Sequence, residues 1–167
     1  DVNNFLFDKK KPIIILDEEP NFLKRILEAK GFKNLILLKD GETKKFKEFK
    51  LTMFKPFSGH IFEESLIGNL IDSALIFENQ NKTAINFNDN TPTLKSCEML
   101  AKRFKKIDLA MINYNAAGPY PSCFNNLSYK EKILQNYKIL NRNFDYMCEI
   151  IKRLKPHSIL PFAGSYI

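Results

Sequence analysis

Short runs of consecutive apolar residues, each about the length of one strand, most constrain the fold of this chain. They lie at 12–16 (PIIIL), 34–38 (NLILL), 109–114 (LAMINY) and 158–162 (SILPF). Uninterrupted apolar runs of this length are typical of strands that are covered on both faces. Stretches with helical periodicity separate several of them, so the sequence predicts an α/β fold.

Three stretches carry the signals of helices. Residues 17–30 have acids and a proline at their start, an apolar face, and a glycine after their end. Residues 93–106 carry apolar side chains at helical spacing. Ser128 and Glu131 form a capping-box pattern, which predicts the start of a long helix that ends near Pro156.

The middle of the chain is typical of antiparallel strands. Residues 43–57 predict one or two strands with an exposed basic face, and residues 71–87 predict a hairpin around the turn NQNK. Hairpins followed by alternating helices and strands imply a mixed sheet with flanking helices. Because no repeat or linker is visible, we expect residues 1–167 to form a single domain.

Composition narrows the functional classes. The chain has 167 residues and a net charge of +7, but its lysines are scattered over nearly every segment. This pattern argues against nucleic-acid binding and favours a small anionic ligand. No apolar run approaches the ~20 residues of a membrane-spanning helix, and no secretory signal opens the chain, so we expect a cytoplasmic protein. The three cysteines form no CxxC pattern and are expected to be buried thiols.

The strand at 83–87 ends in Asn88, Asp89 and Asn90. A carboxylate between two amides at the carboxyl end of a buried strand is either a turn device or a metal and ligand site. Thr91 and Pro92 follow, and we expect them to cap and start the next helix.

His60 lies on a loop after the strands of 43–57, upstream of the hairpin that ends at Asp89. If both side chains reach the same edge of the sheet, they provide nitrogen and oxygen ligands for a shared divalent metal: zinc, iron or manganese. A catalytic zinc needs about three protein ligands, so further ligands must come from outside this chain. The alternative is a surface histidine that is unrelated to Asp89.

Two further loops follow buried strands, at 113–124 and 160–166. Loops at the carboxyl ends of strands are common ligand walls in α/β folds, although packed loops with half-buried tyrosines are the alternative. The residues that we predict to contact substrate are Asn88, Asn90, Tyr114, Tyr120 and Phe162. No residue is assigned a catalytic role.

Several of these stretches together resemble the second half of a metallo-β-lactamase-fold domain. They are G-N-x-x-D-S-A at 68–74, the NDN after the hairpin, DLAMINYNAAGPYPSCF, and LPFAGSY. The resemblance is to the branch that contains L-ascorbate-6-phosphate lactonase and CMP-N-acetylneuraminate hydroxylase. It implies that the chain is the C-terminal part of a larger αβ/βα sandwich.

The resemblance also implies roles for individual residues. Asp89 corresponds to the metal-bridging aspartate of the family, and His60 to a metal-binding histidine. The family's H-x-H-x-D-H motif is absent here, and Phe162 and Ala163 stand where its final histidine is usual. In such domains a metal-bound hydroxide attacks a carbonyl or phosphorus centre, or iron performs oxygen chemistry.

The sequence therefore predicts part of a metal-dependent hydrolase or hydroxylase-like protein that acts on a sugar, sugar-phosphate or sugar-nucleotide. A missing N-terminal half of the domain would supply the remaining ligands, and without it we expect this chain alone to be inactive. A homo-oligomer is the alternative partner. The alternative is a non-catalytic binding module for an anionic sugar or nucleotide. A basic interaction domain is a third class, and steep salt dependence of nucleic-acid binding would identify it.

Overall fold

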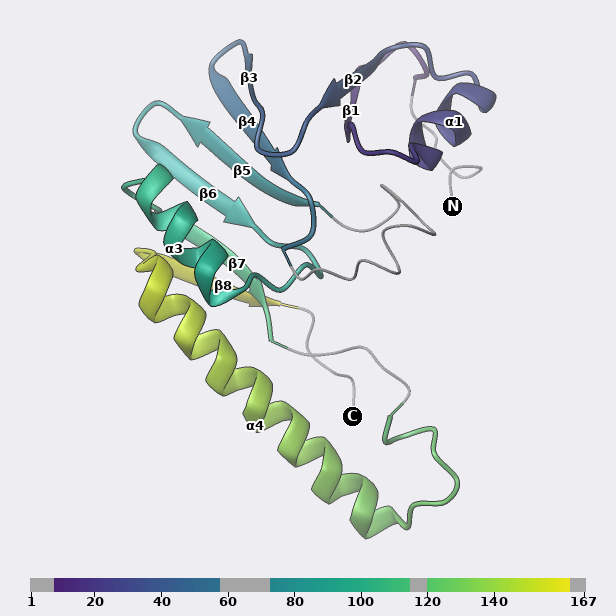
Figure 1. The fold of residues 1–167 in the computed structure, drawn as a ribbon, viewed down its shortest axis with the longest axis vertical. Helices are drawn as coiled ribbons and strands as arrows, with labels where there is room; N and C mark the ends of the chain where they lie inside the picture. Colours follow the sequence, from purple (N-terminus) through teal and green to yellow (C-terminus); the bar gives the residue numbers. More distant parts are fainter. Residues whose placement is uncertain (1–7, 58–72, 115–119, 163–167) are drawn as a thin grey trace.

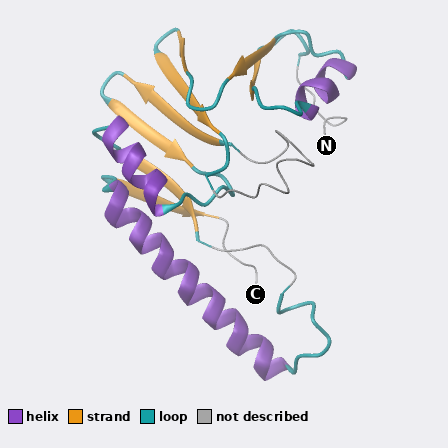
Figure 2. Ribbon diagram, viewed as in Figure 1, coloured by secondary structure: helices purple, strands orange, loops and turns teal. Residues whose placement is uncertain are grey.

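The computed structural model describes residues 8–57, 73–114 and 120–162. Within these residues the chain forms a two-stranded sheet, a six-stranded sheet and flanking helices (Figure 2). The α/β class and the mixed sheet that the sequence predicts are confirmed. The elements are β1 (Ile13–Leu16), α1 (Phe22–Ala29), β2 (Leu35–Leu38), β3 (Thr43–Phe46), β4 (Phe49–Phe54), β5 (Ala74–Asn79), β6 (Lys82–Asn86), α3 (Leu94–Arg103), β7 (Leu109–Asn113), α4 (Tyr129–Leu154) and β8 (Ser158–Phe162).

The six-stranded sheet has the order β3-β4-β5-β6-β7-β8. Neighbours from β3 to β6 are antiparallel, whereas β6, β7 and β8 run parallel. Short turns join β3 to β4 and β5 to β6, whereas the parallel strands need crossover connections. α3 and α4 provide the two crossovers. The carboxyl ends of β6, β7 and β8 consequently lie at one edge of the sheet.

α3 and α4 cover one face of this sheet (Figure 1). Alternate residues of the central strands point toward these helices, as the two-residue period of a strand requires. The main core lies between the two layers. Its members include Ile76 of β5, Ile85 of β6, Phe87, Ala110 and Ile112 of β7, Cys97 and Leu100 of α3, and Met147, Ile150 and Leu154 of α4.

The opposite face of the six-stranded sheet is covered only in part by described residues. Leu16 of β1 and Leu38 of β2 pack against two residues of β4, Leu51 and Met53. Farther along, Phe77 of β5 is 37% exposed and Leu160 of β8 is 50% exposed. Phe77 and Leu160 alternate along their strands with residues that face the helices. Their exposed side chains therefore lie on the second face of the sheet, the face opposite α3 and α4.

The first helix is shorter than the sequence predicts. The prediction starts it at Asp17, but α1 begins at Phe22 because Asn21 is its N-cap and accepts a hydrogen bond from the backbone N–H of Lys24 at 3.1 Å. Pro20 therefore precedes the cap and is not part of the first turn. Gly31 follows the helix with φ +86°, a conformation that glycine adopts at low cost.

The prediction that Thr91 and Pro92 cap and start the next helix is wrong. Thr93 is the N-cap of α3, and its Oγ1 accepts from the backbone N–H of Ser96 at 3.1 Å. The hydroxyl of Thr91 instead donates to Oδ1 of Asn113 at 3.2 Å. Because any of the clustered hydroxyls fits the capping pattern, the sequence alone does not select the right one.

α4 begins with the predicted capping box. The Ser128 side chain accepts from the backbone N–H of Glu131, and the Glu131 carboxylate accepts from the backbone N–H of Ser128 at 2.7 Å. The Ser128 hydroxyl also donates to this carboxylate at 2.6 Å, and this hydrogen bond first, with the one from the backbone N–H, lowers the pKa of Glu131. In Figure 1 the N-terminal half of α4 extends well beyond the sheet. The cap therefore stabilises a helix end that the sheet does not support.

Asp108 links the starts of the three parallel strands. Its side chain accepts hydrogen bonds from the backbone N–H of Thr83 at 2.9 Å and from Nζ of Lys82 at 3.0 Å, and its carbonyl accepts from Ser158 N at 3.0 Å. Lys106 Nζ lies 3.4 Å away. The Thr83 hydrogen bond first, with the two lysines, lowers the pKa of Asp108 to about 2.

The cysteines differ from the prediction. Cys97 is buried in the main core, but Cys123 is exposed and Cys148 is half-buried. Cys123 lies in the loop before α4, and the sheet does not cover this loop. Among the described residues, no helix has both the length and the apolar character needed to cross a bilayer.

Candidate functional site at the carboxyl edge of β6, β7 and β8

The segment after β6 is a tight turn with an exposed acid. Asn88 has φ +50°, and its backbone N–H donates to the side-chain oxygen of Asn86 at 3.0 Å. The backbone N–H of Asn90 donates to the carbonyl of Phe87 at 2.9 Å, which closes the turn. Asp89 is exposed at its tip. The segment is thus a turn, as one of the two interpretations has it, and its carboxylate is available to a ligand.

Asn90 connects this turn to the end of β4. The residue is 5% exposed, and its Oδ1 accepts a hydrogen bond from the backbone N–H of Phe57 at 2.9 Å. Its Nδ2 donates to the carbonyl of Lys55 at 3.5 Å. The ring of Phe57 lies between those of Phe54 and Phe87, with ring centroids 5.6 and 6.2 Å away. Both ends of the amide are therefore engaged by the protein itself.

Asn88 makes the matching contact on the other side of the turn. Its Nδ2 donates to the carbonyl of Ser73 at 2.7 Å. Phe57 and Ser73 are the described residues on either side of the segment 58–72. The two asparagines that flank Asp89 thus hydrogen-bond the backbone at both ends of this segment: Asn90 before it and Asn88 after it. This gives a physical reason for amides on both sides of the acid.

His60 lies within 58–72, outside the described residues, and its pairing with Asp89 stays a prediction. Within the described ranges, no group of three or more His, Cys, Asp or Glu side chains converges as a metal site would require. Of the two predicted ligands, only Asp89 is described. One carboxylate does not satisfy a divalent cation, so the described residues do not fit a complete metal centre.

The edge continues at the ends of β7 and β8. Asn113 pairs in register with Phe162, the last residue of β8, and parallel neighbours lie about 4.8 Å apart. Asn113 also accepts from Thr91 in the β6–α3 connection. Phe162 is half-buried. The structure therefore brings Phe162 to the same sheet edge as the turn that carries Asp89.

The two predicted tyrosines lie in different settings. Tyr114 directly follows β7 and packs, half-buried, against the main core. Tyr120 is 44% exposed, with its ring edge-on to Phe124 at 5.0 Å between centroids. Residues 115–119 between them are not described. Tyr114 thus belongs to the sheet edge, and its ring also fills the packed-loop role that was the alternative.

Asn113 is the residue that the sequence analysis missed. It is the last residue of β7, and its amide lies where the strand, the β6–α3 connection and β8 meet. A polar side chain at the end of an otherwise apolar strand, in the stretch LAMIN, is the signal that would have found it.

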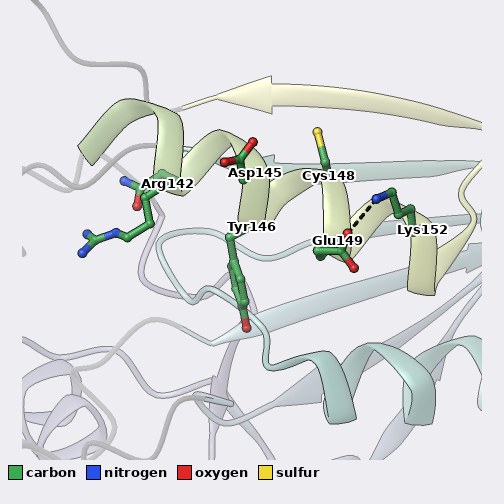
Figure 3. Close-up of a pocket in the computed structure, with 7 residues that line it drawn as sticks. Arg142, Asp145, Tyr146, Cys148, Glu149 and Lys152 are labelled. Atoms are coloured by element: carbon green, nitrogen blue, oxygen red, sulfur yellow. Dashed lines mark hydrogen bonds and ion pairs between the residues drawn. The ribbon is translucent and has the colours of Figure 1, made fainter. Parts of the chain in front are cut away.

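A separate hollow of about 610 Å³ lies along α4 (Figure 3). In the figure the side chain of Tyr146 points toward α3, and its hydroxyl donates to the Pro92 carbonyl at 3.1 Å. Lys152 and Glu149 form an ion pair at 2.7 Å. Because every lining residue belongs to one helix and none is a predicted site residue, the hollow lacks groups that converge from several elements. The lining residues are Arg142, Asn143, Asp145, Tyr146, Cys148, Glu149 and Lys152.

No protein-family profile and no curated protein matches this chain. Solved structures do resemble it. CmlA, a diiron β-hydroxylase from Streptomyces venezuelae, has a TM-score of 0.62 at 16% identity over 90% of this chain and 30% of its own, and a mutant of CmlA gives the same TM-score at 15% identity over 90% and 31%. A possible metal-dependent hydrolase from Veillonella parvula has a TM-score of 0.58 at 17% identity over 93% of this chain and 53% of its own.

At these identities the similarity shows the fold alone. These neighbours are metallo-β-lactamase-fold proteins, and the mixed sheet with flanking helices is that fold. The chain spans about a third of CmlA and about half of the hydrolase.

Proposed function

We propose that this chain is part of a metal-dependent hydrolase or hydroxylase-like enzyme of the metallo-β-lactamase fold, acting on an anionic sugar, sugar-phosphate or sugar-nucleotide. The observation that carries the proposal is the exposed carboxylate of Asp89 at the carboxyl edge, between two asparagines that hold the chain on both sides of 58–72. His60 is three residues along the chain from Phe57. The two predicted ligands are therefore joined by a short, anchored connection.

Two further observations support the proposal. The structural neighbours are named as a diiron β-hydroxylase and a possible metal-dependent hydrolase. The stretches DLAMINYNAAGPYPSCF and LPFAGSY resemble the lactonase and hydroxylase branch. The first contains Asn113 and the second contains Phe162, which pair at the carboxyl edge of the sheet. Tyr114, Tyr120 and Phe162 then form the proposed substrate wall.

The proposal requires residues beyond those described here. The second face of the six-stranded sheet exposes Phe77 and Leu160, a surface that a second sheet of the same domain would cover. We propose that a further segment of polypeptide supplies that sheet, together with the metal ligands that this chain lacks. A cytoplasmic location remains part of the same proposal.

The test is the metal content of the purified natural protein, measured by inductively coupled plasma mass spectrometry. Asp89→Asn should lower bound metal by at least about tenfold, because changes even outside the first coordination shell cost that much. Asp145→Asn removes another exposed carboxylate, on α4, and should leave bound metal unchanged. Unchanged metal content in Asp89→Asn would remove this residue from the site.

A non-catalytic binding module is the second candidate. It is favoured by Phe162 and Ala163, which stand where the family's final histidine is usual. A binding module would retain an anionic sugar or nucleotide in the presence of a chelator. Isothermal titration calorimetry with and without EDTA measures whether binding survives removal of the metal, as the binding module predicts. The enzyme would instead lose turnover when the metal is removed.

A further inference from the structure

The apolar residues of α4 follow a repeat with alternating steps of four and three residues. This average spacing of 3.5 residues is that of the a and d positions in a coiled coil, where one apolar seam faces a partner helix. The repeat continues over most of the helix without a break. Its members are Ile133, Tyr137, Leu140, Phe144, Met147, Ile151 and Leu154.

Among the described residues, only the C-terminal half of this seam packs against the rest of the chain. Met147 and Leu154 are buried in the main core, and Ile151 packs against it. In the N-terminal half, Ile133 is 51% exposed, Tyr137 64% and Phe144 51%. Contiguous exposed apolar side chains of this kind mark interaction surfaces. The seam therefore continues past the sheet onto a capped, free-standing stretch of helix (Figure 1).

The residues that flank the exposed seam carry no charge. The positions beside it are Leu134, Asn136, Asn141 and Asn143. Two identical chains with a net charge of +7 repel one another over most of their surface. A seam flanked by a leucine and three asparagines is one place where two copies meet without like charges in contact. We propose that the N-terminal half of α4 pairs with the same stretch of a second copy.

The charge at one seam position favours an antiparallel pair. Lys130 precedes Ile133 by three residues, so a parallel pair would place Lys130 of one copy directly against Lys130 of the other. An antiparallel pair that crosses between Tyr137 and Leu140 instead places Ile133 level with the second Phe144. Lys130 then lies within one turn of Asp145 of the second copy, which is an opposite charge.

The shape of the molecule agrees with that direction. The sheet and α3 lie beside the C-terminal half of α4 (Figure 1). Antiparallel pairing of the free halves keeps the two sheets at opposite ends of the helix pair. The contact from Ile133 to Phe144 covers roughly 18 Å of helix at about 1.5 Å per residue. A contact of this length is smaller than a standard interface, so the dimer should be weak and concentration-dependent.

Sedimentation velocity over a range of concentrations tests the proposal. The unaltered chain should show a weight-average mass that rises from one toward two chains. Ile133→Lys combined with Tyr137→Lys should remain monomeric with an unchanged circular dichroism spectrum, because neither side chain belongs to the described core. Tyr137→Ser alone, a milder change, should weaken association. Ile26→Lys on α1, where Ile26 is 38% exposed, is the matched control and should dimerise normally.

Three outcomes would overturn the proposal. The unaltered chain would be monomeric at every concentration, the double variant would associate as strongly as the unaltered chain, or Ile26→Lys would abolish association equally. Asp145→Lys tests the direction, since it brings two cations together only in the antiparallel pair. Unweakened association in Asp145→Lys would reject the antiparallel arrangement.

Discussion

The side-chain oxygen of Asn90 accepts a hydrogen bond from the backbone N–H of Phe57 at 2.9 Å, joining residues 33 positions apart. This contact fixes the exit of β4 against the exit of β6. Asp89 is the neighbour of Asn90 and lies exposed on the same turn. The buried side-chain amide of Asn90 thus fixes the position of the turn that carries the exposed carboxylate of Asp89.

Asn90→Ala should lower the free energy of unfolding by about 1–3 kcal/mol, because the N–H of Phe57 loses its partner in a part-buried position. Urea denaturation followed by circular dichroism measures this change. Asn126→Ala, in an exposed loop position, is the control and should change stability by less than about 0.5 kcal/mol. Equal stability of the two variants would show that the amide does not anchor the turn.

Asp108 should make the free energy of unfolding decrease as the pH falls. Its pKa is lowered to about 2 in the folded chain, below the ordinary value near 3.9. A lowered pKa means that the stabilising contribution is complete above the ordinary pKa and is lost as the pH falls toward 2. Denaturation midpoints at several pH values should therefore fall less steeply with acid in Asp108→Asn than in the unaltered chain.

The matched control for this experiment is Asp145→Asn. Asp145 is exposed on α4, and its replacement should leave the acid dependence as it is in the unaltered chain. An Asp108→Asn profile that parallels the unaltered one would mean that the hydrogen bonds from Thr83 and Lys82 do not stabilise the folded state.

The cysteines should react at very different rates with iodoacetamide. Burial raises the pKa of the Cys97 thiol to about 12, so at pH 8 it is both protonated and shielded. Cys123 is exposed and should be alkylated first, since the reaction requires an accessible thiolate. Mass spectrometry of the peptides after short labelling checks the order, and labelling in urea should remove the difference. Early modification of Cys97 in the native chain would contradict its place in the core.

The elements of the sheet could be predicted from sequence because their signals are local. β7 and β8 coincide closely with the apolar runs LAMINY and SILPF, and the Ser128–Glu131 pair marks the start of α4. The start of α1 could not, because the choice between Asp17 and Asn21 as the helix start depends on which side chain reaches a free N–H. Boundaries of this kind follow from three-dimensional contacts.

In the candidate site, too, some features could be predicted from local sequence and others depend on three-dimensional contacts. That Asp89 follows a strand can be read from the chain order. The partners of Asn88 and Asn90 are Ser73 and Phe57, which are distant in sequence. No periodicity reports such a contact, so the sequence suggested that the asparagines orient Asp89 or contact substrate. The structure shows both amides hydrogen-bonded to backbone groups, which holds the turn that carries Asp89.

The parallel half of the sheet has a consequence for how the chain folds. Short turns join β3 to β4 and β5 to β6, and such turns close quickly, whereas β8 can reach β7 only after the whole of α4 has been formed and laid across the sheet. A nascent chain that emerges from the ribosome therefore acquires the Asp89 turn early and Phe162 last. The carboxyl edge is complete only when the final strand arrives, so assembly of the proposed site is the slow, late event of folding.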